Sequence, residues 1–296
     1  MNANQGYYTL ALANGLFVDV GFSILPSFPS LLGNFYSASF KLLDFKTNPA
    51  GSAYYINQWV EGKTNKKIKD IVSADDLVNA EFALANAIYF KGSWKCPFDP
   101  LDTRSAQFHV SPGRACAVNM MTQTAQFKYR LDRRLHCQIL ELPYEGDRLA
   151  MYILLPTETD GLAALESKLT FQSLTSALAK LRRRRLSVAI PRFEMTVGEK
   201  LPKILSKMGM KLAFTPNADL GGIAPGVYIS KVIHKAFIGV DEKGTEAAAA
   251  TIVIGVRGPP PPPLNQDFIA DHPFLFLIRD NKTGSILFLG RLVNPK

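Results

Sequence analysis

Few side chains in this chain of 296 residues have the type and spacing needed for catalysis or metal binding. Four histidines are scattered without the spacing of a catalytic triad or a metal site: His109, His136, His234 and His272. Three cysteines occur without a C-x-x-C pair: Cys96, Cys116 and Cys137. We therefore expect a protein that is not an enzyme and needs no metal or cofactor, with the cysteines as buried free thiols.

One segment offers chemistry to a partner instead. Residues 241–268 read DEKGTEAAAATIVIGVRGPPPPPLNQDF, which neither helix nor strand rules explain. Gly244 interrupts a strand, and Pro259–Pro263 must be extended and cannot donate backbone hydrogen bonds. The result is a long exposed loop, which in a compact domain is usually functional or disordered. Arg257, between Val256 and Gly258, is the natural target for a trypsin-like protease.

The residues before this arginine alternate as a strand inside a sheet would. Residues of one parity are small or β-branched and uncharged: Thr245, Ala247, Ala249, Thr251 and Val253. Glu246 has the opposite parity. This alternation predicts a latent strand that can enter the middle of a sheet, because small side chains pass where bulky ones would jam.

The rest of the chain predicts an α+β fold around an extensive sheet. Central strands, apolar on both parities, are expected at Tyr8–Val18 and Glu81–Phe90. Other strands are expected at 125–130, 136–142 and 149–155 in an antiparallel meander, at 186–193 and 227–240, and at 274–277 and 285–293 in a terminal hairpin. Helices are expected at 24–32, 52–72, 162–181 and 201–208.

Composition and charge limit the partners. With 47% hydrophobic residues and a mean hydropathy of +0.03, the chain can bury a large core. Its net charge of +9 favours polyanions or acidic surfaces. The densest cationic run is Arg182, Arg183, Arg184 and Arg185, for which a polyanion site competes with a solvated helix end. No membrane span and no secretory signal are expected from the sequence.

Four motifs, in this order along the chain, resemble those of the serpin family. They are NAIYFKGSW at 86–94, DEKGTEAAAAT at 241–251, DHPFLF at 271–276 and FLGRLVNP at 288–295. INQWV at 56–60 and MGMKLAF at 208–214 with Ala218 and Asp219 add to them. The resemblance covers residues 8–296 and implies a serpin-like fold, with a large central mixed sheet, additional antiparallel sheets, surface helices and an exposed reactive-centre loop.

The resemblance implies inhibition by suicide-substrate trapping. The serine of the target protease forms an acyl-enzyme with the bait residue, and the cleaved loop inserts as a new strand before deacylation. The implied hinge of this loop is Glu242, Gly244, Thr245, Glu246, Ala247, Ala248, Ala249, Ala250 and Thr251. By the same resemblance Trp94 lies near the start of insertion, and Asn86 and His234 form a hydrogen-bonded pair where the strands part.

The length of the loop locates the scissile bond. Counted from Glu242, the commonest loop length in the family would place Gly258 before the bond and Pro259 after it. Such a bond is a poor substrate, because proline removes the N–H of the leaving group. A loop one residue shorter, which the family also uses, gives the bond Arg257-Gly258. We therefore predict a trypsin-like serine protease as the partner.

The resemblance also sets expectations for organisation and location. We expect residues 1–296 to form a single serpin domain, truncated at the N-terminus relative to the family, so that a large apolar face of its sheet is uncovered. We expect an extracellular, secreted glycoprotein that acts as a monomer, with Asn281 as the candidate glycosylation site. A glycosaminoglycan is a candidate second partner, and neither nucleic acid nor membrane is expected.

Two alternatives stay open. The protein could be a non-inhibitory serpin-like binding protein or an inactive truncated isoform, in which the loop is cut without trapping. The hinge favours inhibition, since no proline and no charge other than Glu246 occurs from Thr245 to Thr251. The run Pro259–Pro263 with Arg257 would also suit an SH3-type ligand, but a stiff spacer beyond the cleaved bond is preferred.

Overall fold

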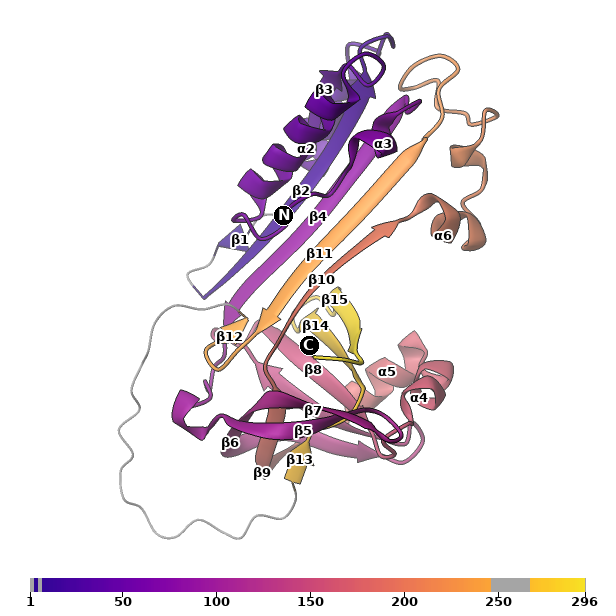
Figure 1. Cartoon of the computed structure of the whole chain (residues 1–296). Helices are drawn as coiled ribbons and strands as arrows, with labels where there is room; N and C mark the ends of the chain where they lie inside the picture. Colours follow the sequence, from indigo (N-terminus) through magenta and orange to yellow (C-terminus); the bar gives the residue numbers. More distant parts are fainter. Residues whose placement is uncertain (1–2, 5–6, 246–266, 296) are drawn as a thin grey trace. The chain divides into compact units, whose positions relative to one another are not determined.

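The computed structural model describes residues 3–4, 7–245 and 267–295. These residues group into two compact units, whose elements Figure 1 labels. Unit 1 comprises Met1–Gln5, Thr9–Phe90 and Met195–Ile238, and unit 2 comprises Gly6–Tyr8, Lys91–Glu194 and Gly239–Lys296. Within the described residues, no helix has both the length and the apolar character needed to cross a membrane.

The first sheet has seven strands, most of which belong to unit 1 (Figure 1). They are β1 (Ala3–Asn4), β2 (Tyr8–Asp19), β3 (Ser39–Leu43), β4 (Phe82–Ser93), β10 (Phe193–Lys200), β11 (Lys231–Val240) and β12 (Gly244–Thr245). The order is β1-β2-β4-β11-β10, with β3 paired to β2 and β12 paired to β4. β4 and β11 are parallel neighbours in the middle of this sheet.

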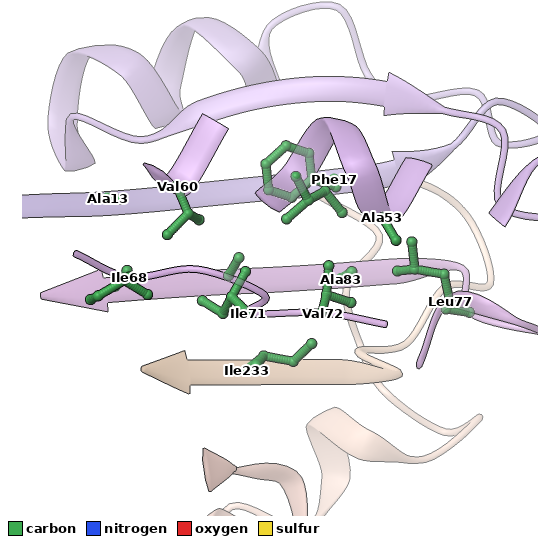
Figure 2. Close-up of a cluster of buried hydrophobic side chains, with 14 of the residues drawn as sticks. Ala13, Phe17, Ala53, Val60, Ile68, Ile71, Val72, Leu77, Ala83 and Ile233 are labelled. Atoms are coloured by element: carbon green, nitrogen blue, oxygen red, sulfur yellow. The ribbon is translucent and has the colours of Figure 1, made fainter. Parts of the chain in front are cut away.

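One face of this sheet is covered by α2 (Pro49–Lys63), by α3 (Ala74–Leu77) and by the segment between them. Asn48 begins α2, since its side chain accepts a hydrogen bond from the N–H of Gly51. Ile56 and Val60 of α2 are buried against the alanines of β4, and Figure 2 shows Val60 with the strand residues of this core. Burial contributes about 1.5–3 kcal/mol for each such aliphatic side chain.

The opposite face of these strands is less covered. α1 (Phe28–Tyr36) packs partly buried residues against a second cluster that contains Leu16 and Phe82. The remaining helices of unit 1 are α6 (Pro202–Lys207) and the 3-10 helix η2 (Leu212–Phe214). On β4, Leu84, Asn86 and Ile88 of this face are half-buried, whereas Phe82 at the start of the strand is buried. The apolar face expected to be uncovered is therefore neither exposed nor fully buried along this strand.

Unit 2 contains the second sheet, in the order β13-β9-β6-β7-β8-β14-β15, with β5 paired to β6. Its strands are β5 (Arg104–Ser111), β6 (Arg114–Asp132), β7 (Cys137–Pro143), β8 (Leu149–Pro156), β9 (Arg182–Pro191), β13 (Asp267–Ile269), β14 (Phe274–Asp280) and β15 (Ile286–Leu292). Two helices, α4 (Leu162–Lys168) and α5 (Phe171–Leu178), pack Leu165 and Leu174 onto β8 and β14, and η1 (Pro100–Asp102) precedes β5.

The predicted α+β fold, both central strands, the meander and the terminal hairpin are confirmed. The helix predicted over 52–72 ends at Lys63, because Asn65 and Lys66 adopt positive φ angles of 51° and 62°. The apolar spacing continues after Lys63 only because an irregular segment buries Ile68, Ile71 and Val72 in the same core.

Three further predictions were wrong in detail. The helix predicted over 162–181 is two helices, because Thr170 caps the start of α5 with a reciprocal hydrogen-bond pair to Ser173. The arginine run 182–185 begins β9 and does not end a helix. All three cysteines are free, but only Cys137 is buried, since Cys96 is exposed and Cys116 is intermediate.

Candidate functional site

A tight turn follows β11 and leads to the residues predicted to form the hinge. Asp241 and Gly244 form an antiparallel bridge, in which the N–H of Asp241 donates to the carbonyl oxygen of Gly244 at 2.8 Å. Oδ1 of Asp241 also accepts from the backbone N–H groups of Lys243 at 2.9 Å and of Gly244 at 3.1 Å. The turn reverses the chain, so β12 is antiparallel to β4 although β11 is parallel to it.

The structure explains why residue 244 is glycine. Its φ is +148°, and a Cβ atom there would lie 2.1 Å from the carbonyl oxygen of Gly92. Gly244 pairs with Ser93 and Thr245 pairs with Gly92, so the two backbones approach closely at this point. A side chain at residue 244 would force the start of the hinge away from β4.

Two buried aromatic rings contact the start of the segment predicted to be the hinge. Trp94 and Tyr144 stack with ring centroids 4.6 Å apart and an interplanar angle of 14°. Nε1 of Trp94 donates to the carbonyl oxygen of Asp241 at 2.9 Å. The backbone N–H of Trp94 donates to the carbonyl oxygen of Lys243. The hydroxyl of Tyr144 lies 2.8 Å from Oγ1 of Thr245. Burial raises the pKa of Tyr144, so its hydroxyl remains a neutral hydrogen-bonding group.

Glu242 is buried and is held by three groups of unit 2, one at its backbone carbonyl and two at its carboxylate. Its carbonyl oxygen accepts from the N–H of Phe98 at 2.7 Å, and Oε1 accepts from the hydroxyl of Thr103 at 2.8 Å. Oε2 lies 3.9 Å from Nη1 of Arg192, whose side chain is 52% exposed. Such an ion pair is worth less than about 1 kcal/mol, so Thr103 is the stronger partner. Burial, reinforced by the charge of Glu242, raises the pKa of Asp241.

In unit 1 a separate polar cluster joins three neighbouring strands. Asn86 of β4 and His234 of β11 are register partners, and Oδ1 of Asn86 lies 2.5 Å from Nδ1 of His234. Nδ2 of Asn86 donates to Oδ1 of Asn14 on β2 at 2.5 Å. Burial lowers the pKa of His234, which favours a neutral ring with Nδ1–H as the donor. Parting β4 from β11 would break the bond between Asn86 and His234.

The other residues of the predicted site lie elsewhere. Asn281 follows β14, is half-buried, and accepts from the hydroxyl of Tyr152 through Oδ1 at 2.7 Å. The four arginines lie at the start of β9. Outside the described residues are Glu246, Ala247, Ala248, Ala249, Ala250, Thr251, Arg257 and Gly258.

Sequence reasoning missed Asn14, Thr103, Tyr144 and Arg192. A signal existed only for Asn14: the tetrapeptide Ala-Leu-Ala-Asn occurs in both central strands, at 11–14 and at 83–86. A buried asparagine in an otherwise apolar strand needs a hydrogen-bond partner, and two strands that share this tetrapeptide can each provide an asparagine to the other. Thr103, Tyr144 and Arg192 lie in segments far from the hinge in sequence, and no local sequence pattern identifies them.

A parallel strand pair in the middle of a sheet, followed by a turn and, in the sequence, by a run of small residues, is typical of one class of protease inhibitor. The chain belongs to the serpin family, as predicted, since the family model described as "Serpin (serine protease inhibitor)" matches residues 1–295. Human serpin B3 is 40% identical over 299 residues, which cover 99% of this chain and 76% of that protein. Human leukocyte elastase inhibitor is 38% identical over 305 residues, which cover 100% and 80%.

Solved structures agree with this assignment. A highly specific serpin of the insect Tenebrio molitor, Serpin48, superposes with a TM-score of 0.87 at 34% identity, covering 99% of this chain and 78% of that one. Uncleaved ovalbumin superposes with a TM-score of 0.88 at 31% identity, covering 99% and 75%. These similarities confirm the serpin-like fold.

Proposed function

We propose that this chain inhibits a trypsin-like serine protease by suicide-substrate trapping, with Arg257 as the bait and Arg257-Gly258 as the cleaved bond. Residues 242–251 act as the hinge of the strand that inserts after cleavage. The catalytic serine belongs to the target, and the contribution of this chain is to change conformation before the acyl-enzyme is hydrolysed. Membership of the serpin family supports protease inhibition in general.

The observation that carries the proposal is the register of β12 on β4. Thr245 lies opposite Gly92, and in antiparallel pairing each step forward on one strand is a step back on the other. If this register continues, residue 251 comes opposite Asn86. Because β4 and β11 are parallel, a strand between them can pair antiparallel with both, and it would replace the contact between Asn86 and His234.

The parity of the hinge supports the same mechanism. The side chain of Thr245 is 0% exposed and contacts Tyr144, so its parity faces the interior at the start of the strand. The following residues of this parity are small: Ala247, Ala249 and Thr251. An unpaired charge at these positions would have to lose its hydration on insertion, which costs several kcal/mol.

The test is to mix the protein with trypsin and look for an SDS-stable band at the summed mass. Wild-type protein should form this band, Arg257→Ala should not, and Arg291→Ala, which removes an exposed arginine on β15, should behave as wild type. Cleavage at residue 257 with release of active trypsin would refute trapping.

A second measurement separates inhibition from its competitors. After cleavage in the loop, strand insertion should raise the melting temperature strongly. An unchanged melting temperature would favour a non-inhibitory binding protein or an inactive chain, since the loop would then be cut without insertion.

We further propose an extracellular, secreted glycoprotein that acts as a monomer and a single domain, with a glycosaminoglycan as second partner. Loss of mass on treatment with an endoglycosidase, absent in Asn281→Gln, would test the glycan. Sedimentation and one calorimetric unfolding transition would test the monomer and the single domain.

A further inference from the structure

The segment that runs from α6 to η2 turns sharply at Gly209. The N–H of Met210 donates to the carbonyl oxygen of Leu205 at 3.0 Å, and the N–H of Gly209 donates to the carbonyl oxygen of Ser206 at 3.1 Å. These two bonds, with a φ of +108° at Gly209, form the Schellman motif that ends a helix. A Cβ atom at Gly209 would meet nothing within 4 Å. The turn is therefore open to solvent, and Met208 and Met210 lie on either side of an exposed corner.

This segment lies at the edge of the first sheet. β10 is the edge strand, and Figure 1 shows α6 directly after it. Leu205 and Phe214 are half-buried, and the N–H of Ile229 donates to the carbonyl oxygen of Ala213 at 3.0 Å, which ties the segment to the chain before β11. Neither α6 nor η2 contains a buried residue. The segment is therefore attached along one side, and its other side faces solvent.

The solvent side of the segment combines apolar and basic side chains. Four large apolar residues are exposed: Ile204, Met208, Met210 and Leu212. Three exposed lysines alternate with them at a spacing of four residues: Lys203, Lys207 and Lys211. We call these seven residues the α6–η2 patch. Single exposed apolar residues are ordinary on a protein surface, whereas several in one short segment indicate an interaction site.

The lysines of the patch are not neutralised by neighbouring carboxylates. The sequence contains no aspartate and no glutamate from residue 200 to residue 218. Among the residues that the structure describes, no carboxylate forms an ion pair with Lys203, Lys207 or Lys211, although Lys200 pairs with Asp76 just before α6. The α6–η2 patch therefore presents apolar side chains together with three uncompensated positive charges.

This combination discriminates between possible partners. In a symmetric contact between two copies of this chain through the patch, the same lysines would approach one another, and like-charge repulsion opposes that contact. A partner bound through phosphates alone would leave the exposed methionines unused. A membrane that contains anionic lipids suits both components, because lysines attract its headgroups while apolar side chains enter the boundary between headgroups and acyl chains.

We propose that the α6–η2 patch binds the surface of a membrane that contains anionic phospholipid. Met208 and Met210, at the corner of the turn, enter the boundary region, and the three lysines stay at the level of the headgroup phosphates. The contact lies on the membrane and does not span it. It adds a partner that was not expected from the sequence, and it goes beyond the proposed inhibition, since it requires neither Arg257 nor the hinge.

The test is co-sedimentation of the full chain with vesicles of phosphatidylcholine, either pure or mixed with phosphatidylserine, at about 0.15 M salt. Two variants separate the components of the patch. M208Q/M210Q removes apolar side chains and keeps the charge, and K203Q/K207Q/K211Q does the reverse. We expect the first to weaken binding to the mixed vesicles about tenfold and the second about a hundredfold. Wild type should bind pure phosphatidylcholine at least about tenfold more weakly than the mixture.

Matched controls change the same kinds of side chain elsewhere. K63Q/K66Q/K69Q removes three exposed lysines at and just after the end of α2, and L101Q/L289Q removes two exposed apolar side chains of unit 2. Each control should change the affinity for the mixed vesicles less than about twofold, because charges and side chains away from the contact are screened by salt or do not reach the membrane. Thermal melting verifies that every variant is folded.

Four outcomes would overturn the proposal. Absence of wild-type binding to the mixed vesicles would exclude a membrane, and equal losses in both triple lysine variants would mean that only overall charge matters. A dimer in sedimentation that is lost in M208Q/M210Q would assign the patch to a second copy of the chain. Tighter binding of poly-glutamate than of the mixed vesicles would assign it to an acidic protein. If a multiple variant does not fold, Met208→Gln or Lys207→Gln replaces it, with the same expected direction.

Discussion

The hydroxyl of Tyr144 lies 2.8 Å from Oγ1 of Thr245, and both residues are fully buried. Tyr144 follows β7, and Thr245 ends β12, so the contact joins segments 101 residues apart in the sequence. Thr245 is also the first residue of the parity that must be buried if the hinge inserts. The contact therefore holds β12 in its register on β4, from which the proposed insertion would start.

Under the proposed trapping mechanism, Thr245→Arg should make the chain a substrate of the protease. Thr245 is already buried beside Tyr144, so the guanidinium would have to be desolvated there, which costs several kcal/mol and displaces β12 from the register in which the proposed insertion would begin. Gel electrophoresis after mixing with trypsin should show the cleaved chain without the SDS-stable band. Glu246→Arg, with the opposite parity, should retain the band; loss of the band in both variants would contradict the parity argument.

Gly244→Ala should destabilise the protein by about 2 kcal/mol or more, because a Cβ atom must move the backbone of Gly92 in addition to adopting an unfavourable φ. Gly62→Ala provides the matched comparison, since Gly62 lies in α2 and a Cβ there meets nothing within 4 Å. Helix propensity predicts that this change stabilises the protein by up to about 1 kcal/mol. Urea unfolding measures the free energy of unfolding of both variants. Equal changes in the two variants would refute the argument that a side chain at residue 244 is not tolerated.

Removing the hydrogen bond to Glu242 should cost more than removing its ion pair. Thr103→Val deletes the 2.8 Å bond and leaves a buried carboxylate oxygen unpaired, which should cost about 1.5–3 kcal/mol. Arg192→Ala removes a partly exposed charge 3.9 Å away and should cost less than about 1 kcal/mol. Chemical unfolding at neutral pH compares the two free energies; the reverse order would show that the ion pair is the stronger contact.

Stability should fall in acid partly through Asp280. Its buried carboxylate accepts from Nε of Arg148 at 3.0 Å and from the N–H of Lys282 at 2.9 Å. Burial acts to raise its pKa, but these bonds hold the pKa of Asp280 below its ordinary value of 3.8. The stabilisation is therefore complete above the unfolded-state pKa and is lost as the pH falls through the folded-state pKa.

Asp280→Asn should accordingly lower the free energy of unfolding at pH 7 by about 1–3 kcal/mol and should lose less stability than wild type between pH 5 and 3. Asp75→Asn is the control, because Asp75 is an exposed carboxylate at the start of α3. Urea unfolding at a series of pH values measures both; parallel pH curves for wild type and Asp280→Asn would contradict the assignment.

Local patterns predicted much of the fold. The strands at 8–19 and 82–93 are apolar on both parities because both of their faces carry neighbours, and this is visible without any structure. The helix boundaries were less predictable, as Lys63 shows: the apolar spacing continued past it in a segment that is not helical. The core contains apolar side chains at regular intervals along the chain, and an irregular segment can place such side chains in the core as well as a helix can.

The sequence by itself determined the family, the small-residue parity from Thr245 onward and the density of arginines at 182–185. Only the tertiary structure decided that the hydroxyl of Tyr144 contacts Thr245, that Asn14 accepts a hydrogen bond from Asn86, and that neighbouring arginines lie on different faces of the sheet. Periodicity is a local property that each segment carries in its own residues. The register between distant strands is not a local property. A slip of one residue moves every side chain to the other face, so the register is fixed only by the packing of the whole sheet.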